Sequence, residues 1–169
     1  DQDIVALVNQ ESTSAAGNQS GSYNAMLTTE GTGKISVPLI QSDFYGYYTS
    51  LTIMTVDGGE ATVTITYTSD STYSSVADHS ETYTLSTTNG FLNRYEGSSA
   101  SAAQSDILDD PAWVGAGSKH MFLGSATIEV TSGSDIVAFV NSESSKAPHA
   151  AERDSMYTYN AFNLAGPVK

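Results

Sequence analysis

The side chains that could carry out chemistry are few and lie far apart in the sequence. None of the three histidines has a second histidine or a cysteine at the spacing of a metal-ligand pair. The serines lack the Gly-x-Ser-x-Gly pattern of a hydrolase nucleophile, and the Gly-x-Gly-Lys segment at 31–34 lacks the full spacing of a phosphate-binding loop. We interpret His79, His120 and His149 as solvated or core-edge side chains, and expect no catalytic residues, no cofactor and no enzyme activity.

The densest group of carboxylates is Asp106, Asp109 and Asp110. Calcium binds several oxygen ligands from acidic loops of this kind. The spacing does not match an EF-hand loop, which needs acidic or amide residues at alternating positions and a bidentate glutamate. The three aspartates are therefore a weak calcium candidate beside the simpler interpretation of a solvated acidic loop, and no metal is predicted.

An aromatic run surrounds Gly46 and consists of Phe44, Tyr45, Tyr47 and Tyr48. Successive strand residues point to opposite faces, so at most half of these rings belong to a core. The exposed half, drawn from Tyr45, Tyr47 and Tyr48, could stack on sugar rings or contact a neighbouring subunit, because aromatic residues are enriched in interfaces. Both interpretations stay open, with core plus interface as the first.

Composition excludes several classes of partner. The chain has 169 residues and a formal net charge of −13, so its own field repels nucleic acid and anionic membranes. It has no cysteine, and no apolar run is long enough for a membrane helix, so we expect no membrane insertion. Threonine, serine, tyrosine, glycine and valine dominate, which favours an all-β extracellular domain. A start at Asp1 without methionine is expected of a chain whose signal sequence has been removed.

The strand signals predict a β-sandwich of eight to nine short strands. The clearest is Ala61–Thr68, where alanine, valine, isoleucine and tyrosine alternate with four threonines and indicate one buried and one wet face. Pro38 predicts a sheet edge or a bulge, since proline cannot donate to a ladder, and residues 57–59 predict a hairpin turn. Further strands are expected over 3–9, 34–41, 47–56, 81–87, 135–141 and 157–164, and residues 120–123 and 125–130 form either a strand pair or one bulged strand.

One stretch of sequence occurs twice. Residues 3–12 and 135–144 are identical at eight of ten positions, and Ser22-Tyr-Asn-Ala25 is echoed by Thr158-Tyr-Asn-Ala161. Self-similarity at a nearly fixed spacing indicates a repeated structural unit. The chain thus opens with the motif that also closes it.

The first copy predicts a strand with apolar residues on both faces, which suits a central strand. Residues 10–22 are rich in serine, alanine, glycine, asparagine and glutamine, which indicates a flexible hinge, with Asn18 as a glycosylation candidate. We therefore divide the chain into a strand and hinge (1–22) and a sandwich domain (23–169). The strand docks either in its own domain or in a neighbour's, and the residues expected to drive polymerisation are Ile4, Val5, Ala6, Leu7 and Val8.

Several segments together resemble tandem immunoglobulin-like β-sandwich modules of secreted and cell-surface bacterial proteins. They are the Val-Pro-Leu-Ile strand at 37–40, the Tyr-Gly-Tyr-Tyr-Thr-Ser-Leu-Thr-Ile strand at 45–53, the alternating strand at 61–67, and the "IVAxVN…YN" stretch at 136–160. In such proteins this last stretch marks the junction between modules. The resemblance implies an immunoglobulin-like sandwich with an adhesive or structural role and does not imply catalysis.

These observations predict a structural subunit of an extracellular filament or surface array. Copies of the chain would join head to tail, because the N-terminal strand of each subunit adds to the sandwich of the next. The alternative is a cell-surface adhesive or carbohydrate-binding module that uses the tyrosine run to hold surface glycans.

Overall fold

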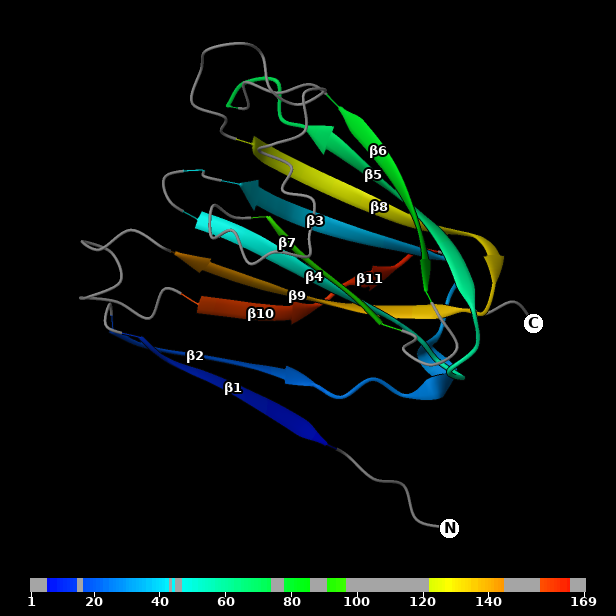
Figure 1. The fold of residues 1–169 in the computed structure, drawn as a ribbon. Helices are drawn as coiled ribbons and strands as arrows, with labels where there is room; N and C mark the ends of the chain where they lie inside the picture. Colours follow the sequence, from blue (N-terminus) through cyan, green and yellow to red (C-terminus); the bar gives the residue numbers. More distant parts are fainter. Residues whose placement is uncertain are drawn as a thin grey trace.

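The structure, a computed structural model, is all-β. It describes residues 6–14, 17–42, 44, 47–73, 78–85, 91–96, 122–144 and 156–164. Within these ranges the chain forms a five-stranded sheet and a four-stranded sheet, together with a separate two-stranded hairpin at the N-terminus (Figure 1). The all-β expectation is confirmed. No helix in the described part of the chain is long and apolar enough to cross a bilayer.

All neighbouring strands in these sheets are antiparallel. The five-stranded sheet has the order β11 (Phe162–Asn163), β3 (Lys34–Ser42), β8 (Phe122–Gly133), β5 (Ala61–Ser69) and β6 (His79–Leu85). The four-stranded sheet has the order β10 (Met156–Asn160), β9 (Ile136–Ser144), β4 (Tyr47–Thr55) and β7 (Phe91–Glu96). The hairpin consists of β1 (Leu7–Ser14) and β2 (Gly17–Asn24), and a 3-10 turn, η1 (Thr28–Glu30), follows it.

The core lies between the two larger sheets and is filled by alternate residues of their strands. In β5 the alternation agrees with the sequence: Ala61, Val63, Ile65 and Tyr67 are buried, and the threonines between them are not. Their neighbours in the core come from both sheets, which therefore pack face to face in a sandwich-like arrangement. They include Ile35, Val37 and Ile128 of the five-stranded sheet and Leu51, Ile53, Ile136 and Val140 of the four-stranded sheet.

Local sequence signals place two irregular features. The pairing of β3 with β8 shifts register between Val37 and Ile40, around Pro38, so the predicted bulge is confirmed. The turn after β4 contains Gly58 at a φ of +72°, a left-handed conformation that favours glycine. It is not the hairpin turn expected from the sequence, because it leads from β4 in the four-stranded sheet to β5 in the five-stranded sheet. Asp57 fixes this turn, because its carboxylate accepts hydrogen bonds from the Gly59 amide at 2.8 Å and the Ser134 hydroxyl at 3.1 Å, and these bonds lower its pKa.

The N-terminal segment differs from the sequence expectation. Residues 7–14 pair along their whole length with residues 17–24, so much of the segment expected to be a flexible hinge belongs to the two strands of the hairpin. β1 has no partner other than β2 among the described strands, and it is not a central strand. The side chain of Leu7 is 62% exposed, and the sandwich core closes without the hairpin.

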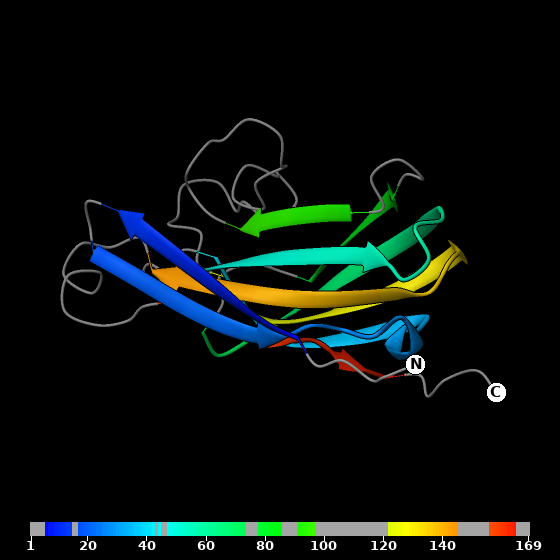
Figure 2. The same ribbon diagram turned by 90° about the horizontal axis from the view of Figure 1, so that it is seen from below.

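The hairpin lies alongside β10. Figure 1 shows β2 beyond β10, and Figure 2, seen from below, shows the hairpin crossing in front of β9. This position brings the two copies of the repeated sequence into contact.

Candidate functional site

The two copies of the repeat form two equivalent hairpins. In the first, Leu7 pairs with Asn24, and in the second Phe139, which occupies the place of Leu7, pairs with Asn160. The same register continues through the next two residue pairs of each hairpin. The repeat therefore encodes a strand pair, β1–β2 or β9–β10, with one fixed register.

A backbone hydrogen bond at the root of each hairpin is also repeated. The Ala25 amide donates to the Ala6 carbonyl at 2.9 Å, and the Ala161 amide donates to the Ala138 carbonyl at 3.0 Å. The four alanines occupy matching places in the two copies. The equivalence thus extends from the strands to the point where the chain leaves each hairpin.

The surroundings of the two hairpins differ. In the second copy Val140 is fully buried, and the hydroxyl of Tyr159 donates to the Leu39 carbonyl at 3.0 Å. Burial raises the pKa of Tyr159 to about 12. In the first copy the matching residues, Val8 and Tyr23, are only half-buried and lie outside the sandwich core. The second hairpin therefore belongs to the four-stranded sheet and contributes to the core, whereas the first lies outside both larger sheets.

The first hairpin docks on the second through one ring stack. The ring of Tyr23 lies on that of Phe139, with centroids 4.6 Å apart and planes 11° from parallel. Phe139 points away from the core, because its neighbours Ala138 and Val140 point into it. The stack therefore covers the outer face of the four-stranded sheet.

Two hydrogen bonds accompany the stack. The Thr158 hydroxyl donates to the Ser22 carbonyl at 2.7 Å, and the Asn160 side-chain amide donates to the Asn24 carbonyl at 3.2 Å. Two carbonyls of β2 are thus satisfied by side chains of β10, and no backbone ladder joins the two strands.

Close approach of β2 to β10 depends on Gly21. A Cβ atom added to this glycine would lie 2.7 Å from the Thr158 methyl group and 3.5 Å from the Thr158 Cβ. The first distance is shorter than a normal contact, so a side chain here would push the hairpin outward. Glycine at position 21 permits the docked arrangement.

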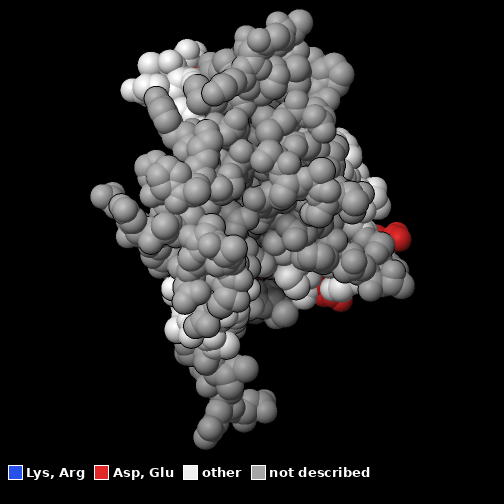
Figure 3. Space-filling view, turned by 60° about the vertical axis from the view of Figure 1, so that its left-hand side comes forward, with Lys and Arg blue, Asp and Glu red and all other residues white. Residues whose placement is uncertain are grey.

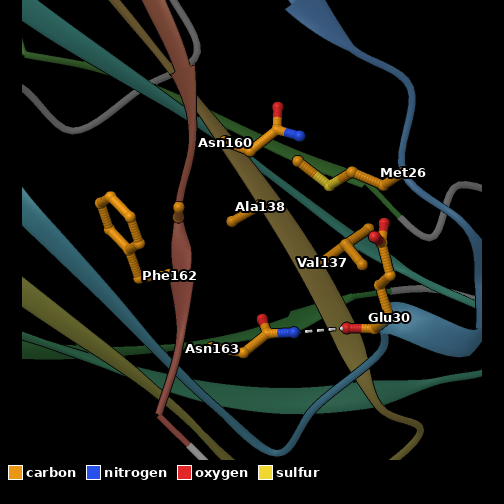
Figure 4. A pocket seen from close by; sticks show the side chains of 8 residues that line it. Met26, Glu30, Val137, Ala138, Asn160, Phe162 and Asn163 are labelled. Atoms are coloured by element: carbon orange, nitrogen blue, oxygen red, sulfur yellow. Dashed lines mark hydrogen bonds between the residues drawn. The ribbon is translucent and has the colours of Figure 1, made fainter.

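A pocket of about 260 Å³ lies at the root of the hairpin (Figure 4). Met26 and Glu30 border it on the side of the hairpin, and Val137, Asn160 and Phe162 border it on the side of the sandwich. The pocket is open, and its lining combines apolar groups with two amides and a carboxylate. It separates the hairpin exit from β9.

The chain is held firmly from Glu30 onward. The Asn163 side-chain amide donates to the Glu30 carbonyl at 2.7 Å, as the dashed line in Figure 4 shows, and the Glu30 carboxylate accepts from the Leu27 amide at 2.8 Å. Thr32 and Ile136 exchange two backbone bonds of 3.0 Å. The segment 25–28 connects the hairpin to this anchored part of the chain.

A buried polar cluster fixes β10, which supports the docked hairpin. The side-chain carbonyl of Gln41 accepts from the Ser142 hydroxyl at 3.3 Å and from the Tyr157 hydroxyl. The backbone amide of Gln41 donates to the Thr49 hydroxyl at 2.9 Å. Burial raises the pKa of Tyr157. The docking strand is thus anchored in the core by tyrosines on one face and presents Thr158 and Asn160 on the other.

The charged groups of the described surface are mainly acidic. On the face shown in Figure 3, the charged side chains of the described residues are acidic. Lys34 forms an exposed ion pair with Glu129, with 3.4 Å between its Nζ and the carboxylate. The described residues on this face therefore form no basic patch for an anionic partner.

The structure places the predicted polymerisation residues only in part. Ala6 and Leu7 are exposed, Val8 is half-buried, and all three belong to the hairpin or its root, whereas Ile4 and Val5 lie outside the described residues. Asn18 is in β2, opposite Thr13. The glycosylation candidate therefore lies near the tip of the hairpin.

The other candidates are not brought together into a site. Tyr47 is half-buried at the start of β4 and bridges to Phe44, Tyr48 follows it in the same strand, and Tyr45 lies outside the described residues. Asp106, Asp109 and Asp110 also lie outside them, as do His120 and His149, while His79 begins β6. In the described ranges no group of three histidine, aspartate or glutamate residues is placed to hold a metal ion.

Sequence reasoning missed the residues that dock the hairpin: Tyr23, Phe139, Thr158 and Asn160. The sequence did contain a signal, namely the second pair of similar segments, 22–25 and 158–161. A strand pair that is repeated with nearly the same spacing has the same pairing partners in both copies. Placing one echo on the other would have predicted the second strand, β2, and its register.

No protein-family model and no curated protein matches the sequence. Among solved structures, the crystal structure of Thermotoga maritima 1070 is similar to this chain, with a TM-score of 0.50 and 15% sequence identity. The similarity covers 81% of this chain and 98% of that chain. At this identity the likeness concerns the all-β fold alone.

Proposed function

We propose that this chain is a structural subunit of an extracellular filament or surface array, built on an immunoglobulin-like sandwich. Copies associate head to tail when the N-terminal hairpin of one subunit docks on β9–β10 of the next. The exchanged unit is the whole hairpin, because β1 pairs with β2 along its length. This contact is heterologous and does not close on itself, so it can propagate.

One observation carries the proposal: the hairpin docks on the outside of a sandwich whose core is complete without it. The core residues Leu51, Val140 and Ile128 are fully buried, and every described member of the core cluster belongs to the two larger sheets. Release of the hairpin breaks the Tyr23–Phe139 stack and two hydrogen bonds, and it leaves the core closed. Exchange between subunits restores the same contacts, so its net cost is small.

In this proposal the segment 25–28 is the hinge, and the bond from the Leu27 amide to the Glu30 carboxylate opens when the hairpin is released. The length of the hinge sets the distance between exchanging subunits. Four residues, 25–28, reach at most about 14 Å when extended. A released hairpin can therefore dock only on a subunit that already lies beside its own. The proposal predicts closely abutting subunits in the assembly.

An engineered disulfide tests this proposal. In the variant Gly21→Cys/Thr158→Cys the two Cβ atoms would be about 3.5 Å apart, at the short end of the 3.5–4.5 Å range that a disulfide accepts. The chain has no other cysteine. Oxidation at high protein concentration is expected to give a ladder of covalent oligomers on non-reducing gels, because the bond forms between subunits.

The matched control is Thr64→Cys/Thr82→Cys. The hydroxyls of this exposed pair on β5 and β6 are 3.0 Å apart, so its disulfide closes within one chain. The control should give only monomer. If the hairpin variant also gives only monomer at every concentration, the hairpin stays on its own sandwich and the proposed exchange is wrong.

A further inference from the structure

We infer that the exposed face of the N-terminal hairpin is a second docking face, and that it binds the hairpin of a second copy of this chain. The inference rests on the proposed function, because the incoming hairpin must first leave its own sandwich. It adds a site to that proposal. The incoming hairpin would bind on β1–β2 of a subunit whose own hairpin is still in place.

The chemistry of the face supports this inference. The second hairpin holds the first with an apolar ring at Phe139, a hydroxyl at Thr158 and a side-chain amide at Asn160. The places of these three residues in the first hairpin are taken by Leu7, Ser22 and Asn24. The hydroxyl and the side-chain amide thus have counterparts of the same kind in the first hairpin, and the ring of Phe139 has an apolar counterpart, Leu7.

The three counterparts are exposed and lie together. Leu7 is 62% exposed, and Ser22 and Asn24 are exposed as well. Leu7 pairs with Asn24 across the hairpin, so their side chains share one face. A groove of about 280 Å³ is bordered by these residues, by Tyr23 and by Tyr159 and Asn160 of β10, so the exposed face adjoins the existing contact.

The occupant is specified by the contact that the structure already contains. That contact needs a ring in the position of Tyr23 and two free carbonyls on the same strand edge, those of Ser22 and Asn24. The matching ring of the second hairpin, Tyr159, donates to Leu39 inside the sandwich and is not free. Within this chain, the N-terminal hairpin of another copy is therefore the element that supplies the complementary edge.

The consequence for assembly is an order of events. A released hairpin meets the exposed face of a neighbour before that neighbour has released its own hairpin. The stack of three hairpins then holds the two subunits within the short reach of the hinge, where exchange onto β9–β10 can follow. The second face thus provides a site of first contact.

Mixed disulfides between two full-length single-cysteine variants test the inference. Because Ser22 takes the place of Thr158, Gly21→Cys in one molecule should bond to Ser22→Cys in another. The variants are distinguished by a size tag on one of them. The Gly21→Cys side chain also crowds Thr158 in its own molecule, which favours the released hairpin that the experiment needs.

Two further mixtures separate the inference from the proposed function. Gly21→Cys with Thr158→Cys reports docking on β9–β10 of another molecule, and Gly21→Cys with Thr82→Cys, an exposed site on β6, reports random collision. We expect the bond from position 21 to position 22 to form at least tenfold faster than the collision control. If it forms no faster while the bond to position 158 does, the second face is wrong and the exchange stands. If neither bond exceeds the control, both ideas fail.

A second measurement uses no cysteine. Leu7→Phe installs the ring found at position 139 and should strengthen self-association by roughly 2- to 10-fold, the factor that corresponds to an added aromatic pair. Leu7→Asn should weaken self-association, and Met54→Asn, at an exposed position on β4, should leave it unchanged. Sedimentation velocity measures these effects, and an equal response to all three substitutions would contradict the inference.

Discussion

The ring of Tyr23 lies nearly parallel to that of Phe139, with 4.6 Å between the centroids, and each ring belongs to a different copy of the same repeated hairpin. The contact joins two equivalent elements through non-equivalent residues, since the residue that matches Phe139 in the first copy is Leu7. The contact is therefore heterologous: one hairpin contributes Tyr23 and the other contributes Phe139. A heterologous contact between copies of the chain can propagate, which is why this contact bears on assembly.

Tyr23→Ala should loosen the hairpin and leave the sandwich folded. A stacked aromatic pair contributes about 0.5–1.5 kcal/mol beyond its buried area, and Tyr23 is not a member of the core cluster. Hydrogen exchange should accelerate for the amides of β1 and β2 and stay unchanged for β5. The exposed Tyr73→Ala is the control, and faster exchange in β5 of the Tyr23 variant would show that the hairpin supports the core.

Two buried threonines of β4 should respond in opposite ways to valine. The Thr49 hydroxyl accepts a hydrogen bond from the backbone amide of Gln41. The substitution Thr49→Val leaves this buried donor unpaired and should cost about 1–3 kcal/mol of unfolding free energy. The buried Thr55 hydroxyl has no partner among the described residues, so Thr55→Val should be neutral or stabilising. Urea unfolding measures both, and a larger loss at position 55 would contradict this account.

Stability should fall at alkaline pH because of Tyr159. Burial raises the pKa of this phenol to about 12 in the folded chain, while an unfolded tyrosine has a pKa near 10. The contribution is complete below about pH 10 and is lost as pH rises from about 10 to 12, since the unfolded chain then releases the proton more readily. Tyr157 is shifted in the same direction by burial.

The variant Tyr159→Phe keeps the ring and removes the titrating group, so its unfolding free energy should fall less steeply over this range of pH. Urea unfolding at several pH values gives the slopes, and the ultraviolet absorbance of tyrosinate identifies the group. An identical slope in the variant would assign the alkaline loss to other residues.

Gly133→Ala should destabilise the fold more than Gly58→Ala. Both glycines have positive φ, at +96° and +72°, so alanine at either position carries the left-handed penalty of about 1–2 kcal/mol. At Gly133 a Cβ atom would also overlap the Glu60 carbonyl, whereas Gly58 has open space around it. The crowding adds about 1–3 kcal/mol, and thermal unfolding of both variants measures the difference. Equal losses would mean that the end of β8 relaxes.

The sequence predicted those parts of the fold that local patterns determine. The alternation in β5 gave its buried face, and Pro38 marked the bulge in β3. A turn does occur at 57–59, but the predicted hairpin is wrong, because this turn leads from β4 in one sheet to β5 in the other. β7 was missed, since residues 91–96 follow a turn signal and mix apolar with polar side chains without alternation.

The candidate site was harder to predict because its residues are ordinary when taken singly. The segment 17–24 contains one aromatic residue, Tyr23, among small polar residues, a composition typical of linkers. Pairing with β1 and contact with β10 make it a strand, and both are tertiary effects. Likewise, the break at Ala161, where the chain passes from β10 to β11 in the other sheet, has no local signal.

The pairing of strands that are distant in sequence affects how fast the chain folds. β4 lies between β9 and β7, so Leu51 pairs with Val140 from the far end of the described chain. Sheets made of such distant partners fold on the millisecond-to-second scale, because the entropy of loop closure is lost before the paired strands stabilise the chain. During synthesis the four-stranded sheet must wait for residues 136–144. The N-terminal hairpin, whose strands are adjacent in sequence, is complete long before the surface on which it docks.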